Sequence, residues 1–219
     1  MKAEAPGKDL IALVADKNME HALRGLLNRH ESLGIRPLRE KRDYDIFVHP
    51  HRDPGCLAKS TEFLRPWQRT YRRALVMFDR EGCGREAQSR LELESELEQQ
   101  LARSGWDERA AVVIIDPELE NWVWSSSPLV DRALGWTGRS PDLRQWLLDE
   151  GFLKSAAEAK PAPPKPAMDR ALRMGKKPHS SSLFQQLAET VSLSGCTDDA
   201  FLKLRQILIG WFPLSASEN

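Results

Sequence analysis

Short apolar runs divide the first half of the chain and predict its strands. Residues 10–15, 74–78 and 110–115 are continuous apolar stretches between polar flanks, and residues 45–49 (DIFVH) indicate a further short strand. Such runs are typical of strands that are buried on both faces. The segments between them carry apolar residues at helical spacing, as in 16–33 and 85–103. Strand and helix therefore alternate, which predicts an α/β fold with a mainly parallel four-stranded sheet and flanking helices.

The second half of the chain has a different pattern. Its apolar positions recur at helical spacing in residues 140–148, 182–190 and 198–211. Residues 155–167 are rich in proline, alanine and lysine, which predicts an extended, mobile loop. We therefore expect an α/β core at residues 8–125 and a helical C-terminal annex, packed on that core, at residues 126–219.

Composition limits the class of protein. The 219 residues include 32 Lys plus Arg and 32 Asp plus Glu, so net charge gives no global drive towards nucleic acid or a membrane surface. The three cysteines are far apart in the sequence, which argues against a disulfide framework and a zinc site. The first ten residues lack an apolar signal core, and no apolar run approaches the roughly 20 residues of a membrane helix. These features predict a cytoplasmic protein with no membrane association.

Acidic residues follow two of the expected strands. Glu20 comes after the first strand, and Asp79 and Glu81 come after the third. Parallel strands bring such positions to one edge of a sheet. Carboxylates gathered there raise one another's pKa, and a divalent cation resolves the conflict, with oxygen ligands favouring Mg²⁺ or Mn²⁺. Because Gly82 and Gly84 would let the backbone approach a phosphate, this edge is a candidate metal and phosphate site.

Basic residues suggest phosphate contacts. Residues 65–73 (RPWQRTYRR) interleave arginine with two aromatic residues, a mixture that suits phosphate contact with base stacking. The alternative is a segment whose aromatic side chains pack on the core and whose arginines are solvated. The loop expected after the second strand would lie at the carboxyl edge of the sheet. The candidates from these two segments are Arg52, Arg69 and Arg72.

Several short motifs resemble the TOPRIM family, which includes topoisomerases, primases and OLD-type nucleases. The resemblance rests on an apolar strand followed by Glu, then a second apolar strand that ends in DxD or DxE before a glycine. It is strongest with small TOPRIM-like proteins encoded near bacterial restriction and anti-phage defence genes. In those proteins a Glu recurs two residues before a Trp, as Glu120 and Trp122 do here. The stretches concerned are VADKNMEHALRGLL, ALVMFDREGCG, IIDPELENWVW, KKPHSSSLFQQLAE and CTDDAFLKLRQIL.

The resemblance also implies roles for individual residues. Glu20 would be a metal ligand or general base, Asp79 and Glu81 would be catalytic metal ligands, and Glu120 would be an additional ligand. A lysine that stabilises the developing charge on phosphate would be matched by Lys176 or Lys177. The chain departs from the family pattern in two places, since no glycine precedes the first Glu and the second motif is DxE.

Three hypotheses follow. The first is a nuclease-like hydrolase that uses Mg²⁺ or Mn²⁺ to cleave DNA or RNA in anti-phage defence. The second is a non-catalytic TOPRIM-like subunit that binds a partner protein or nucleic acid within a larger defence complex. The third is a structural interaction protein in which Glu20, Asp79 and Glu81 form ordinary salt bridges with Arg80 and Arg85.

Overall fold

A four-stranded sheet forms the centre of the protein. The computed structural model describes residues 7–125 and 127–214. All neighbouring strands are parallel, in the order β2-β1-β3-β4, which confirms the predicted α/β class. The strands lie where the apolar runs predicted them: β1 (Lys8–Val14), β2 (Tyr44–Val48), β3 (Tyr71–Asp79) and β4 (Ala110–Ile115).

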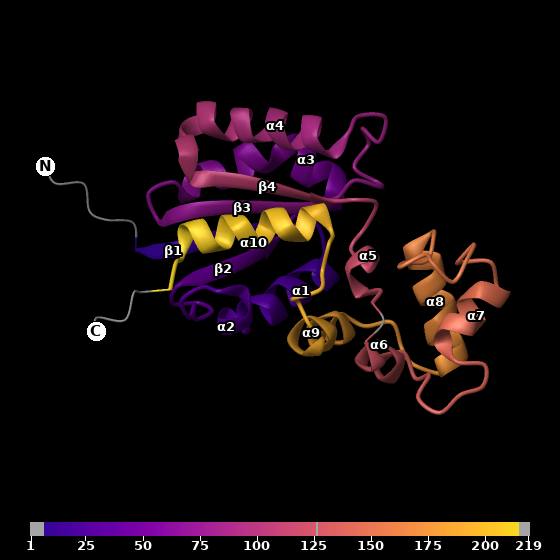
Figure 1. Cartoon of the computed structure of the whole chain (residues 1–219). Helices are drawn as coiled ribbons and strands as arrows, with labels where there is room; N and C mark the ends of the chain where they lie inside the picture. The colour runs from indigo at the N-terminus through magenta and orange to yellow at the C-terminus, as the bar shows by residue number, and fades with distance from the viewer. Residues whose placement is uncertain (1–6, 126, 215–219) are drawn as a thin grey trace, which may run out of the picture.

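Helices cover both faces of this sheet (Figure 1). One face carries α1 (Lys17–Leu27), α2 (His30–Leu33) and α10 (Asp199–Trp211), and the other carries α3 (Arg52–Leu64) and α4 (Arg90–Leu101). The side chains of β1 from Leu10 to Val14 are fully buried. The continuous apolar runs are thus explained, because side chains on both faces of each central strand meet a helix.

The second half of the chain is divided between two places. Helix α9 packs against α1 and α10 packs against β4, so both belong to the layers of the core. Figure 1 shows the remaining helices beyond the carboxyl ends of the strands. Among residues 7–125 and 127–214, no helix is long and apolar enough to cross a membrane. The C-terminal helices are α5 (Glu120–Val123), α6 (Pro128–Ala133), α7 (Leu143–Asp149), α8 (Pro164–Gly175) and α9 (Ser181–Thr190).

The helices expected at 126–219 thus pack partly on the core, through α9 and α10, and partly against one another, as α6 and α9 do. The first residue of this annex and its last five lie outside the described residues, as do residues 1–6 of the segment that was searched for a signal peptide. The loop expected at 155–167 ends early, because α8 begins at Pro164 and buries Ala167 and Met168. Proline is tolerated in the first turn of a helix, where its missing N–H would have had no partner.

Two local expectations were wrong for identifiable reasons. Residues 49–56 read as a loop because they contain two prolines and a glycine, yet α3 begins at Arg52. Pro54 lies in the first turn of that helix, and Gly55 is required there because a Cβ would overlap the imidazole of His49. The helix expected at residues 85–103 starts only at Arg90, where Ser89 forms a reciprocal capping box with Glu92.

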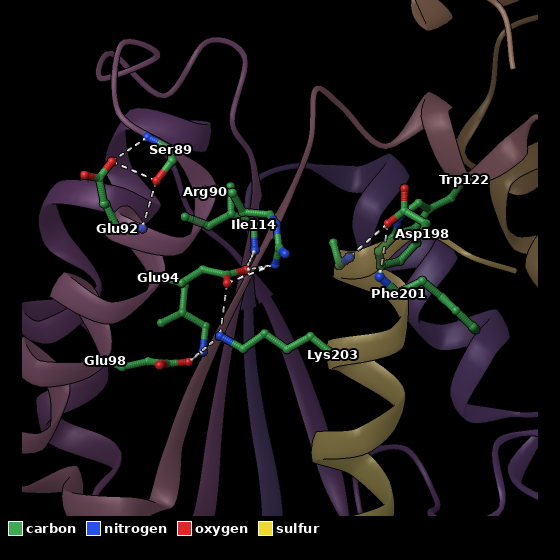
Figure 2. Close-up of polar contacts among 12 residues, drawn as sticks. Ser89, Arg90, Glu92, Glu94, Glu98, Ile114, Trp122, Asp198, Phe201 and Lys203 are labelled. Atoms are coloured by element: carbon green, nitrogen blue, oxygen red, sulfur yellow. Dashed lines mark hydrogen bonds and ion pairs between the residues drawn. The ribbon is translucent and has the colours of Figure 1, made fainter.

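Side chains of α4 close the exposed edge of β4 (Figure 2). The N–H of Ile114 donates to Glu94 Oε1 at 2.9 Å, and the N–H of Val112 donates to Glu98 Oε1 at 3.0 Å. Four residues of helix rise about 6 Å and two residues of strand about 6.6 Å, so the two spacings match. Lys203 of α10 donates to both carboxylates, at 3.2 and 2.8 Å. A helix thus takes the place of a fifth strand.

Candidate functional site

The topology of the sheet singles out the carboxyl ends of β1 and β3 as a candidate binding position. The helix after β1 (α1) and the helix after β3 (α4) lie on opposite faces, and ligands of open α/β sheets bind at such switch points. The register of the two strands pairs Val14 with Met77. Two residues further along each strand, Asp16 and Asp79 therefore stand side by side at the carboxyl edge.

Asp79 is the most perturbed group at this edge. Its backbone N–H donates to Asp53 Oδ1 at 2.8 Å, whereas its own Oδ1 is buried and has no hydrogen-bond partner among the described residues. Burial raises the pKa of Asp79 well above its ordinary value, and the charges of four neighbouring carboxylates raise it further: Asp53, Glu120, Asp16 and Glu118. A carboxyl group in this position either keeps its proton or needs a cation.

The neighbours of Asp79 come from several elements. Asp16 caps α1, since its side chain accepts a hydrogen bond from the N–H of Met19 at 2.9 Å. Asp53 lies in the first turn of α3, and burial raises its pKa. We use the name carboxyl-edge cluster for Asp16, Asp53, Asp79, Glu118 and Glu120.

The annex supplies a cation to this cluster. Glu118 and Glu120 follow β4, and burial raises the pKa of both carboxyls. Glu118 Oε1 accepts a hydrogen bond from the N–H of Lys165 at 2.9 Å, and its Oε2 lies 3.9 Å from Lys165 Nζ. Burial lowers the pKa of Lys165, but the charges of Glu120, Glu118, Asp79 and Asp16 outweigh it and raise the pKa overall. The first turn of α8 therefore holds a charged ammonium group beside the cluster.

Glu20 is engaged elsewhere. It lies one turn into α1, where Lys17 Nζ and Arg24 Nη2 contact its carboxylate at 2.6 and 2.8 Å. Burial opposes its ionisation, yet these hydrogen bonds outweigh burial and leave its pKa below the ordinary value. Arg24 also pairs with Glu40 at 3.0 Å, so Glu20 belongs to an ion-pair network before β2. The structure brings Asp16, not Glu20, beside Asp79.

Glu81 lies at the rim of the cluster. It is exposed, and its N–H donates to the carbonyl of Pro117 at 3.0 Å. Its charge contributes to the raised pKa of Glu118, which places it on the β4 side of the edge. Gly82 and Gly84 have φ of 83° and 88°, so this turn needs glycine at both positions. Of the four acidic residues singled out in the sequence, Asp79 and Glu120 lie in the cluster and Glu81 lies next to it.

The salt bridges of the third hypothesis are not the ones found. Arg80 pairs with Asp116 at 2.9 Å, and Arg85 pairs with Glu96 at 2.6 Å. Within the described residues Asp79 has no ion-pair partner within 4 Å. Glu20 does form a salt bridge with an arginine, Arg24, and Glu118 of the cluster pairs with Lys165, whereas Asp79 at the centre of the cluster is in none of these pairs.

The basic candidates are spread over the molecule. Arg52 is exposed at the start of α3, next to Asp53 and therefore at the carboxyl edge. Arg69 and Arg72 lie at the amino end of β3, the opposite edge of the sheet. Lys176 and Lys177 are exposed just beyond the far end of α8, about 15 Å along the helix from Lys165 at a rise of 1.5 Å per residue. The structure brings Arg52 towards Asp79 and does not bring the other four there.

Sequence reasoning missed several members of the site. Asp16 was not among the candidates, although it ends the first apolar run much as Asp79 ends the third. That shared position after a strand was the available signal. Asp53 and Lys165 carried none, because one lay in a segment taken for a loop and the other in a segment taken for a linker.

The cluster offers the right kind of donor for a hard divalent cation, but not a finished coordination shell. All five members provide oxygen ligands, and Asp79 Oδ1 still lacks a partner. In the part of the chain that the structure describes, no three His, Cys, Asp or Glu side chains are placed to hold a metal ion together.

Comparison with known proteins gives no family for this chain. No protein-family model, no curated protein and no solved structure matches it. The resemblance to TOPRIM proteins therefore remains a hypothesis that rests on the short motifs themselves.

Proposed function

We propose that the carboxyl-edge cluster binds Mg²⁺ or Mn²⁺ and that the protein cleaves phosphodiester bonds in DNA or RNA. One observation carries this proposal: Asp79 Oδ1 is buried without a hydrogen-bond partner among four other carboxylates. Leaving a buried polar atom unsatisfied costs about 1–3 kcal/mol, so such an atom calls for an explanation. A cation that is held only during function explains it.

The cluster suggests a division of roles. Asp79, Asp16 and Glu120 would hold the ion, because each follows the carboxyl end of a different strand. A bound divalent ion would supply an activated water and neutralise charge on the phosphate. The ammonium of Lys165 and the guanidinium of Arg52 carry the positive charge that would orient a phosphate at this edge.

A second candidate function is a non-catalytic subunit that binds a partner protein or a nucleic acid. Two observations favour it. Glu20, the residue that the resemblance makes a general base, is neutralised by Lys17 and Arg24. In addition, among residues 7–125 and 127–214 no three ligands are assembled for a metal ion. In that case the acidic edge would bind cations or a basic partner without turnover.

The biological setting belongs to the same proposal. The resemblance suggests a role in bacterial anti-phage defence, alone or in a larger complex. A cytoplasmic location agrees with the three cysteines, which are all free thiols.

Titration with Mn²⁺, followed by thermal unfolding, tests the metal site. The wild type should gain about 2.7 kcal/mol at a concentration 100 times the Kd. Asp79→Asn should lose this response, yet its metal-free Tm should be higher than that of the wild type, because the amide removes a charge that burial and four carboxylates disfavour. Glu96→Gln, an exposed change on α4, is the control and should respond like the wild type.

Labelled DNA and RNA, single- and double-stranded, then separate the two functions. Cleavage that needs Mg²⁺ or Mn²⁺ and is lost in Asp79→Asn supports the nuclease. Metal binding without cleavage of any substrate supports the non-catalytic subunit. A wild type that shows no thermal response to either ion rejects the metal site and the nuclease with it.

A further inference from the structure

The helix that carries Glu120 is too short to be stable without contacts from its neighbours. Helix α5 spans only Glu120–Val123, a single turn, and isolated helices of this length are not stable. One side of this segment faces a cavity of about 650 Å³, which is lined by Leu119, Trp122, Val123 and Trp124, among others. Leu119, Val123 and Trp124 are nevertheless buried, so directional contacts add to apolar packing in fixing the position of α5.

Asp198, the N-cap of α10, provides two such contacts (Figure 2). Its Oδ1 accepts a hydrogen bond from the indole Nε1 of Trp122 at 2.9 Å, and its Oδ2 accepts one from Nδ2 of Asn121 at 2.8 Å. The Asp198 side chain is only 9% exposed. Hydrogen bonds to a buried carboxylate are stronger than those between neutral groups. The Asp198 side chain therefore binds Asn121 and Trp122, the two residues that directly follow Glu120.

The same carboxylate also anchors itself. Asp198 Oδ1 accepts hydrogen bonds from the N–H groups of Ala200 and Phe201, at 3.1 and 3.2 Å, at the start of α10. The ring of Trp122 packs edge-on against Phe201, with ring centroids 5.6 Å apart. Helix α10 packs against β4, so its contacts with α5 fix the position of α5 relative to the sheet that carries Asp79. Capping α10 needs only one acceptor, so capping alone does not explain the bond from the second oxygen to Asn121.

We propose that Asp198 is a positioning residue that fixes Glu120 at the carboxyl-edge cluster and so sets the affinity of the edge for a divalent ion. The inference rests on the proposed metal site. Two hydrogen bonds from adjacent residues to one fixed carboxylate restrain both the displacement and the rotation of a one-turn helix. Without them Glu120 samples several orientations, and the cluster loses a ligand. Groups that orient a metal ligand typically change affinity about 10- to 100-fold when they are removed.

Two neighbouring substitutions give a matched test. Asp198→Asn keeps an oxygen to cap α10 but replaces the acceptor for Asn121 with a donor and removes the charge that Lys160 Nζ contacts at 3.5 Å. Asp199→Asn makes the same change of charge at the next residue, which is exposed in the first turn of the helix. Titrated with Mn²⁺ alone, Asp198→Asn should bind about 10- to 100-fold more weakly than the wild type. Asp199→Asn should stay within about twofold, since it contacts neither α5 nor the cluster.

Trp122→Phe supports the same test from the other partner. It removes the indole N–H and leaves an aromatic ring against Phe201, so it should also weaken Mn²⁺ binding while Tm changes little. A loss of Tm without a loss of affinity in both variants would mean that Asp198 has only a structural role, and the inference would be overturned.

Amide hydrogen exchange in chelator separates this inference from the proposed function. The N–H groups of Asn121 and Trp122 donate to Glu118 O and Leu119 O, each at 2.9 Å, and report on the opening of α5. Asp198→Asn should speed their exchange and leave β3 and β4 unchanged. Unchanged exchange at α5 refutes the positioning role even if Mn²⁺ binds. Faster exchange in a protein that never binds Mn²⁺ refutes the metal site instead, and with it the claim that Asp198 sets metal affinity.

Discussion

Replacing Glu94 with leucine tests whether α4 closes the edge of the sheet by charge and hydrogen bonding. Glu94 is 1% exposed and accepts the N–H of Ile114 at 2.9 Å. Its carboxylate also contacts Arg90 Nη1 at 3.0 Å and Lys203 Nζ at 3.2 Å. Leucine has a similar size but offers no acceptor. The variant therefore leaves a buried N–H unsatisfied and two cations without this partner.

The cost follows from these contacts. An unsatisfied buried N–H costs about 1–3 kcal/mol, and breaking a buried ion pair by removing one partner costs about 3–5 kcal/mol in total. Lys203 still pairs with Glu98 at 2.8 Å in this variant, so we expect the loss in the free energy of unfolding to stay within about 3–5 kcal/mol. For a chain of this length each kcal/mol lowers Tm by roughly 2–4 °C. We expect Tm to fall by about 6–20 °C.

Glu96→Leu is the matched control on the same helix. Glu96 pairs with Arg85, but the two side chains are 42% and 39% exposed, so solvent screens this pair and it contributes little to stability. Urea unfolding followed by circular dichroism gives both free energies of unfolding. Equal losses in the two variants would show that Glu94 does not hold α4 on the edge, and the reasoning would fail.

A second readout concerns the edge itself. With α4 loosened, the N–H groups of Val112 and Ile114 become available for pairing with another chain. Light scattering at rising protein concentration should therefore detect association in Glu94→Leu before it does in Glu96→Leu. Association at equal concentrations in both variants would contradict this account.

Three further predictions concern the site and its surroundings. The pKa of Asp79 is higher in the folded protein than in the unfolded protein. At pH values above the ordinary pKa of aspartate, the native state therefore binds more protons than the unfolded state, and the free energy of unfolding falls as pH rises. The Tm advantage of Asp79→Asn over the wild type in chelator should thus be larger at pH 8 than at pH 4; a constant difference would contradict the shift. Gly55→Ala should cost about 1–3 kcal/mol in urea unfolding, because its Cβ overlaps His49, and a neutral effect would mean that this contact relaxes freely. The double variant Arg69→Ala, Arg72→Ala should leave the Mn²⁺-induced change in Tm unaltered, since both residues lie at the opposite edge; a lost response would link the two edges.

Local pattern determined much of this protein. Each strand lies within a few residues of an apolar run, because a strand covered by helices on both faces must be apolar throughout. Gly34 ends α2 in the left-handed region, with φ of 79°, and the side chain of Asp198 caps α10, which are positions that these residue types commonly take. The positions of Asp79 and Glu120 after their strands could also be read from the chain.

Only the tertiary structure decided which acidic residues meet. The sequence gives the direction of each strand but not the strand order, and the placing of β1 beside β3 is what brings Asp16 next to Asp79. Glu20 follows the same strand one helical turn later than Asp16, and there Lys17 and Arg24 neutralise it, since their positions on α1 favour that pairing over a site at the edge. Lys165 reaches the cluster from a segment that composition had assigned to a linker. The periodicity of apolar residues in the sequence indicates which residues are buried. Contacts between residues that are distant in the sequence depend on how whole helices and strands pack.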